Sequence, residues 1–360
     1  MKLNWLLTFI PIAIALDWYG ANPIVVFLAS ALALVPLAGL TEDATDALAT
    51  YVGPTWGGML SASLGNAPEI IIGFFALRQG LVRVVKSSLA GSIVGNLLFG
   101  LGLSMLAGGL KHGTQSFNRQ VAGMNGGLLW LAAAGLIIPA VFHHSSAAVD
   151  REISLEISAV LFAVYLASLL YTLVTNRPAL GKEAVRAEVQ NCPQPLGGEA
   201  GWSRNKALAI LAVMTLGLAV MSEILTDAIE PASESLGLTP VFAGVFLLAL
   251  VGNVAQIFNA VSFARSDRMD LSLGVTVGSS IQVALVVAPV LVFCGVLMGQ
   301  PMNLLFSRFE IVAVGLSVLV TRQLISDGQS TWLEGLMLVA VYLMLGVGFF
   351  YLPPIAMGGP

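Results

Sequence analysis

The stretch Gly65-Asn66-Ala67-Pro68-Glu69-Ile70 lies inside a long apolar segment, and a related stretch, Gly252-Asn253-Val254-Ala255-Gln256-Ile257, lies inside another. An acid or an amide at bilayer depth is costly, so it is interpreted first as part of a functional site. Two copies of one motif predict a single site built from both halves of an internally duplicated transporter. The copies differ at their fifth residue, which is the carboxylate Glu69 in the first and the amide Gln256 in the second.

The composition is that of a membrane protein with many spans. Of the 360 residues, 57% are hydrophobic and only 10% are charged, and the mean hydropathy is +0.89. Soluble domains carry about 25% charged residues, so a soluble protein is excluded. The net charge is -4 without a run of like charges, which indicates the lipid bilayer rather than nucleic acid as a partner. Two cysteines, Cys192 and Cys294, do not make a disulfide framework.

The pattern of apolar runs predicts an all-α polytopic membrane protein with eleven transmembrane helices, since a span needs about 20 apolar residues. We expect one extra helix in residues 1–20, a five-helix repeat in 21–175, a polar linker in 176–204 and a second five-helix repeat in 205–360. The predicted spans are about 3–17, 22–40, 55–78, 81–108, 119–142, 152–175, 205–226, 239–264, 270–297, 305–323 and 332–352. The fourth and ninth are long enough to tilt or break.

Lysine and arginine in the loops predict the orientation. With the N-terminus in the cytoplasm, eleven of the 16 basic residues fall on the cytoplasmic side. The other five fall on the far side: Arg78, Arg83, Lys86, Arg151 and Arg308. We therefore expect a cytoplasmic N-terminus and linker, in what is best interpreted as a prokaryotic inner membrane.

The two halves align as an internal repeat. A shift of 187 residues superposes the two motifs and also pairs Gly91-Ser92 with Gly278-Ser279. Upstream of the motifs, a shift of 181 residues pairs Glu42 with Glu223 and Asp46 with Asp227. Matches at Gly, Asn, Ser, Glu and Asp are not the chance matches of apolar segments. Five helices per repeat is an odd number, so the repeats are predicted to enter the membrane with opposite orientation.

The motif residues have the chemistry of a site for a hard cation. Asn66 and Glu69 share one helix face, as do Asn253 and Gln256. Calcium takes oxygen ligands from carboxylates, amides and carbonyls. A proline inside a helix also releases the carbonyl four residues back, here that of Leu64. We expect the site to consist of Glu69, Asn66, Gly65, Leu64, Gln256, Asn253 and Gly252. The alternative for Glu69 is a neutral buried acid that donates a structural hydrogen bond.

Polar residues of the following helices are candidates to line the ion path. They are Ser92, Asn96, Ser279, Ser280 and Gln282. For each serine, a hydrogen bond back to its own helix is an equally good interpretation. Four acids near predicted span ends form either an ion vestibule or solvated helix ends: Glu42, Asp46, Glu223 and Asp227. The three histidines, His112, His143 and His144, lie in predicted loops and are not expected to be ligands.

The two motifs, together with Gly91-Ser92-Ile93-Val94-Gly95-Asn96 and the run Arg268–Gln282, resemble the calcium/cation antiporter superfamily, in particular its cation/proton exchanger branch. The resemblance covers nearly the whole chain. It implies an eleven-helix protein that is not an enzyme, needs no cofactor and exports calcium in exchange for protons. It also implies a midplane site with one glutamate from each half; the first maps onto Glu69 and the second onto position 256, where this chain has Gln256.

The missing carboxylate leaves the transported ion open. Two glutamates neutralise one divalent ion, but Glu69 alone leaves a calcium site with a net charge of +1, which is unfavourable at bilayer depth. A monovalent cation with Glu69 is neutral. Calcium/proton exchange by alternating access is our first prediction. A sodium or potassium/proton antiporter, or a calcium exchanger with impaired coupling, is the nearest alternative. A channel and a non-transporting scaffold are alternatives of other classes, and the oligomeric state is open.

Overall fold

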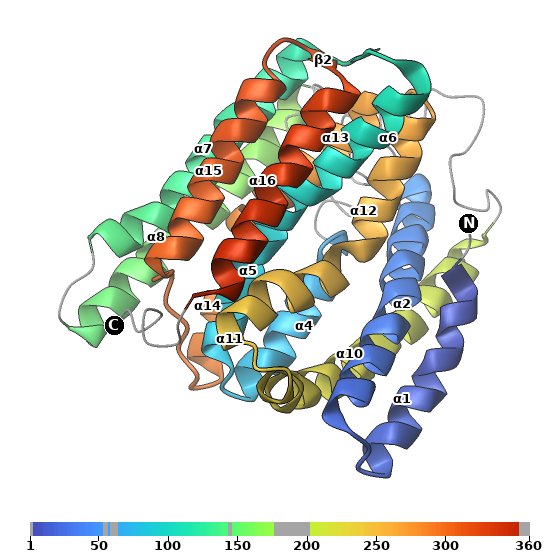
Figure 1. The fold of residues 1–360 in the computed structure, drawn as a ribbon, viewed down its shortest axis with the longest axis vertical. Helices are drawn as coiled ribbons and strands as arrows, with labels where there is room; N and C mark the ends of the chain where they lie inside the picture. Colours follow the sequence, from blue (N-terminus) through green and yellow to red (C-terminus); the bar gives the residue numbers. More distant parts are fainter. Residues whose placement is uncertain (1–2, 53–56, 58–63, 143–145, 176–201, 353–360) are drawn as a thin grey trace.

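A computed structural model describes residues 3–52, 57, 64–142, 146–175 and 202–352 of the chain. This described part is a bundle of long helices, with one small sheet in which β1 (Gln115–Ser116) pairs antiparallel with β2 (Gln329–Ser330) (Figure 1). Most of the predicted linker (residues 176–201), with Cys192, lies outside the described residues, as do His143 and His144.

Eight helices in the described part are long and apolar enough to cross a bilayer. Three shorter ones complete eleven: the N-terminal η1–α1 (Leu3–Thr8 and Phe9–Trp18), α4 (Ala67–Arg78) and α15 (Arg308–Leu324). The chain is therefore an all-α polytopic membrane protein, which confirms the fold class predicted from the sequence.

After η1–α1, the same series of helices occurs twice. The first set is α2 (Pro23–Tyr51), α4, α5–η2–α6 (Val82–Val94, Gly95–Gly100 and Leu101–His112), α7 (Arg119–Val141) and α8 (Ala147–Thr175). The second set is α10 (Arg204–Ser235), α11–η3–α12 (Pro240–Phe242, Ala243–Leu248 and Ala249–Arg265), α13–η4–α14 (Met269–Gln282, Val283–Val287 and Ala288–Leu297), α15 and α16 (Trp332–Phe350). The two sets correspond in order to the two repeats predicted from the sequence.

The long helices of both repeats contain a π-helical segment at matching positions. In the first repeat η2 begins at Gly95, and in the second η4 begins at Val283, directly after Gln282. A π segment is a local widening of the helix and is frequent at functional sites. The sequence predicted that these two helices are long enough to tilt or break; they do not break, and each contains a widened segment.

The first helices of the repeats, α2 and α10, pack against each other and against α1 (Figure 1). Both are longer than the apolar runs 22–40 and 205–226 predict. Polar residues are tolerated within these helices because carbonyls of the same helix satisfy their hydroxyl groups: Thr41 Oγ1 donates to the Leu37 oxygen at 2.8 Å, and Thr226 Oγ1 donates to the Ser222 oxygen at 2.9 Å. The four candidate vestibule acids consequently lie within helices rather than at their ends.

Helix α5 crosses η3 at two glycines. A Cβ atom on Gly91 would meet the backbone of Val245, and one on Gly244 would meet the Ser87 side chain. Small residues that let backbones approach closely are the usual means of helix association in lipid. The Gly91-xxx-Gly95 pattern predicts such a crossing, and Gly91 makes it, whereas a Cβ on Gly95 would meet nothing within 4 Å.

Candidate cation-binding site

The first motif forms a turn followed by the start of a helix. Gly65 and Asn66 make the turn, and α4 begins at Ala67 with Pro68 and Glu69 in its first turn. Pro68 does not lie inside a helix as expected; it occupies a first-turn position of α4, where a helix needs no amide hydrogen. The helix start also places partial positive charge beside Glu69, which favours a carboxylate there.

The second motif lies within an unbroken helix. Residues Gly252 to Gln256 all belong to α12, with Ala255 at the position that Pro68 has in the first motif. Alanine keeps its amide hydrogen, so the helix continues where the first repeat has a turn. A Cβ on Gly252 would contact the Glu69 Cγ at 3.6 Å, so α12 passes directly beside Glu69.

Gln256 connects the two motifs. Its Nε2 atom lies 3.1 Å from Glu69 Oε1, 3.3 Å from Asn66 Oδ1 and 3.3 Å from the Gly65 carbonyl oxygen. On its other side, Gln256 Oε1 accepts a hydrogen bond of 2.6 Å from Ser279 Oγ. The side chains of Gln256 and Glu69 are 4% and 9% exposed. Three oxygen atoms from the first repeat therefore surround one amide nitrogen from the second.

Each motif asparagine is bonded to the long helix of the opposite repeat. Asn66 Nδ2 donates to Gln282 Oε1 at 2.7 Å, and Asn253 Oδ1 accepts from Asn96 Nδ2 at 3.2 Å. Gln282 is the last residue before η4, and Asn96 lies in η2. The π segments thus lie where the long helices contact the motifs, and all four amides are buried.

The predicted path residues are only partly brought together. Ser279 joins both motifs, since its hydroxyl also donates to Asn66 Oδ1 at 2.8 Å. Ser280 instead donates to the carbonyl of Thr276 in its own helix at 2.9 Å, which is the alternative that the sequence left open. Ser92 is buried on α5, one turn before Asn96.

The four candidate vestibule acids separate into two groups. Glu42 lies beside the motifs, while Asp46 is exposed further along α2. At the far end of α4, Glu223 Oε1 lies 3.6 Å from Arg78 Nη2, and Asp227 Oδ1 accepts a hydrogen bond of 2.6 Å from Gln79. Only Glu42 is therefore placed to contribute to the site itself.

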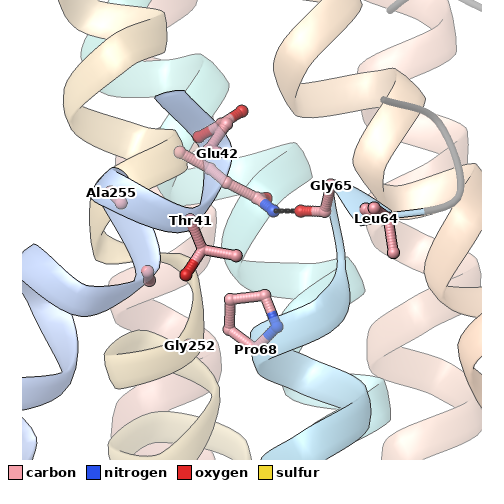
Figure 2. Close-up of a pocket in the computed structure, with 9 residues that line it drawn as sticks. Thr41, Glu42, Leu64, Gly65, Pro68, Gly252 and Ala255 are labelled. Atoms are coloured by element: carbon pink, nitrogen blue, oxygen red, sulfur yellow. Dashed lines mark hydrogen bonds between the residues drawn. The ribbon is translucent and has the colours of Figure 1, made fainter. Parts of the chain in front are cut away.

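A small cavity separates Glu42 from the first motif. Figure 2 shows Thr41 and Glu42 of α2 on one side of it, and Gly65 and Pro68 on the other. Its volume is about 10 Å³, close to the space that one water molecule needs. Its lining residues are Ala38, Thr41, Glu42, Leu64, Gly65, Pro68, Gly252, Ala255 and Gln256.

Asn259 was not among the site residues predicted from the sequence. Its Nδ2 atom donates to Glu42 Oε2 at 3.2 Å, and it lies three residues after Gln256, on the same face of α12. An amide in an apolar helix at this spacing from Gln256 is the signal that would have identified it. His112, by contrast, lies at the end of α6, not in a loop, and its Nε2 is 2.9 Å from the Arg265 carbonyl oxygen.

Two inverted repeats with a buried polar site at their interface define the class of the protein, a secondary transporter. The family model for the sodium/calcium exchanger protein matches residues 22–174 and 206–351, one segment for each repeat. The chain belongs to this family.

Named relatives extend over almost the whole chain. A protein of Aphanothece halophytica named Ca(2+)/H(+) antiporter is 42% identical over 97% of this chain and 96% of its own length. The Ca(2+)/H(+) antiporter ChaA of Bacillus subtilis is 37% identical over 91% of this chain and 92% of its own. The solved structure of native YfkE matches with a TM-score of 0.84 and 32% identity, covering 98% of this chain and all of that one.

Proposed function

We propose that this protein is a secondary active antiporter that exchanges a cation, calcium before others, for protons by alternating access. One observation carries the proposal: the buried carboxylate of Glu69 in the first repeat lies 3.1 Å from Gln256 of the second, between two inverted repeats. Relatives named Ca(2+)/H(+) antiporter over nearly the same length support calcium as the ion.

The surroundings of Gln256 Nε2 indicate where the cation binds. An amide NH₂ carries partial positive charge, and here it lies among oxygens of a carboxylate, an amide and a carbonyl, which are the ligand types of calcium. Rotation of the Gln256 amide by half a turn directs its oxygen toward the same three atoms. The resulting ligands are Glu69, Asn66, the Gly65 carbonyl and Gln256. Leu64 and Gly252 line the adjoining cavity, and Asn253 accepts a hydrogen bond from Asn96 of the first repeat.

Exchange follows from competition for one carboxylate. Removal from water favours the protonated, neutral form of a buried acid, and a nearby cation favours the ionised form. Cation binding therefore displaces the proton from Glu69, and protonation displaces the cation. Gln256 contributes an oxygen but neither a charge nor a proton.

Alternating access requires one end of the site to close while the other opens. The bonds of Gln79 and Arg78 to α10 close the end to which α4 runs. The cavity lies at the opposite end of the motif, next to α2. We propose that α2 and α10 slide across the other helices. This movement would close the end that now has the cavity and open the end that is now closed.

The proposed orientation has the N-terminus and residues 176–204 in the cytoplasm of a prokaryotic cell, so that the cavity faces the cytoplasm. The loop charges support this orientation. Proton entry from outside then drives cation export, and no cofactor takes part.

A monovalent cation/proton antiporter is the second candidate, and Gln256 is the observation that favours it. With one carboxylate in the network, sodium or potassium makes a neutral complex, whereas calcium leaves an uncompensated charge.

Fluxes in everted membrane vesicles that contain the full-length protein distinguish these functions. An inside-acid gradient is expected to drive uptake of ⁴⁵Ca²⁺, and collapse of the gradient with an ionophore is expected to stop it. Sodium or potassium uptake in place of calcium supports the second candidate. Flux that does not depend on the proton gradient indicates a channel. If no cation is transported, the protein is not an antiporter.

A further inference from the structure

We infer that Glu42 supplies the second negative charge of the cation site, the charge that Gln256 lacks. The inference rests on the proposed function, and it names the residue that lets a site with one motif glutamate accept a divalent ion.

The position of Glu42 supports this inference. Glu42 and Gln256 line the same cavity, together with Gly65 and Gly252 from the two motifs. A cation in this cavity lies between the carboxylate of Glu42 and the oxygen cluster around Gln256. The cavity has room for about one water-sized species, which suits a largely dehydrated ion better than a hydrated one.

The orientation of the Glu42 carboxylate supports the inference as well. Asn259 Nδ2 bonds Glu42 Oε2 at 3.2 Å, so α12 fixes both this carboxylate and, one turn earlier, the Gln256 side chain. Thr41, the neighbour of Glu42 in the cavity wall, uses its hydroxyl hydrogen on the Leu37 carbonyl. The charged group of this wall is therefore Glu42.

The net charge of a calcium complex also favours Glu42 as a ligand. Glu69 alone gives a calcium complex a net charge of +1, and an uncompensated charge in a low-dielectric site is strongly unfavourable. Glu69 and Glu42 together make the complex neutral. Glu223 and Asp227 do not serve this purpose, because they bond to residues at the other end of α4.

The test is a comparison of Glu42→Gln with wild type in proteoliposomes and by calorimetric calcium titration of the purified full-length protein. We expect calcium affinity to fall at least about tenfold, which is the effect of about 1.4 kcal/mol. Because the remaining site has one negative charge, proton-coupled sodium or potassium flux is expected to rise relative to calcium flux. A merely structural role would not change the ion preference in this way.

Two further variants make the result decisive. Glu42→Gln combined with Gln256→Glu returns the second carboxylate to the α12 side of the site and is expected to recover most of the calcium affinity. Asp43→Asn makes the same charge change one residue along α2, at a position that does not line the cavity, and is expected to bind calcium as the wild type does. If Glu42→Gln does not fold, Asn259→Ala, which releases Glu42 from α12, is expected to weaken calcium severalfold.

Unchanged calcium affinity and ion preference in Glu42→Gln would overturn the inference, as would an equal loss in Asp43→Asn. These results differ from failure of the proposed function. In that case wild-type protein itself would show no proton-coupled cation flux.

Discussion

At the scale of single residues, the site is an arrangement of oxygen atoms closed by one amide. Gln256 places its nitrogen among three oxygens of the first repeat, and Ser279 holds the amide from the other side. A glutamine at this position gives the site hydrogen-bond donors where a glutamate would give a charge. We therefore propose that ion affinity and ion choice depend on very few side chains.

Gln256→Glu adds a negative charge at the centre of the site. Calcium affinity is expected to rise at least about tenfold. The measurement is calcium titration of purified protein, with Gln300→Glu, an exposed position outside α12, as the control. An unchanged calcium affinity would show that the Gln256 side chain does not point into the cation site.

The sequence predicted the main residues of the site but not their geometry. Spacing along the chain and the match between the halves identified Glu69, Asn66, Asn253 and Gln256. The bonds of Asn66 to Gln282 and of Asn253 to Asn96 could not be derived, because they depend on how the repeats pack. Asn259 does have a signal in the sequence, its spacing of three residues from Gln256, but its bond to Glu42 could not be derived because the two residues lie on different helices.

At the scale of helices, one residue explains why the motif copies differ. The first copy has a turn at Gly65 and Asn66 before Pro68 in the first turn of α4, whereas Ala255 lies within the continuous α12. From the sequence we expected the proline inside a helix, whereas it lies in the first turn of α4. The π segments η2 and η4 could not be predicted from the sequence; they adjoin or contain the buried amides Gln282 and Asn96, which bond to the opposite repeat.

Gly91→Ala tests the contact between α5 and η3. The added Cβ would overlap the Val245 backbone, which cannot rotate away, so we expect a loss of about 2 kcal/mol or more of stability. Gly95→Ala is the matched control, because its Cβ meets nothing within 4 Å, and its stability is expected to stay within about 1 kcal/mol of wild type. Thermal unfolding in detergent measures both, and equal melting temperatures would contradict the close approach.

At the scale of the whole molecule, the duplication determines the architecture. The apolar runs and the repeat predicted eleven helices in two inverted sets, and the number and order of helices agree. The lengths of α2 and α10 did not follow from hydropathy, because the partners of their acids lie on other helices: Glu42 accepts a hydrogen bond from Asn259 of α12, and Glu223 lies 3.6 Å from Arg78 of α4.

Labelling of Cys192 tests the proposed orientation. This residue lies outside the described part of the chain, in the predicted linker, and we expect a membrane-impermeant maleimide to label it in everted vesicles but not in intact cells. Cys192→Ser keeps Cys294, a half-buried thiol in α14, and is the control for background labelling. Labelling of Cys192 in intact cells would reverse the proposed topology.

The most direct test of the central claim is simultaneous measurement of calcium uptake and proton release in everted vesicles that carry wild type or Glu69→Gln. Glu230→Gln, an exposed acid on α10, serves as the control. We expect wild type and Glu230→Gln to release protons as calcium enters, and Glu69→Gln to do neither, because a glutamine cannot exchange a proton for a metal ion. Calcium-driven proton release that continues in Glu69→Gln would contradict the account.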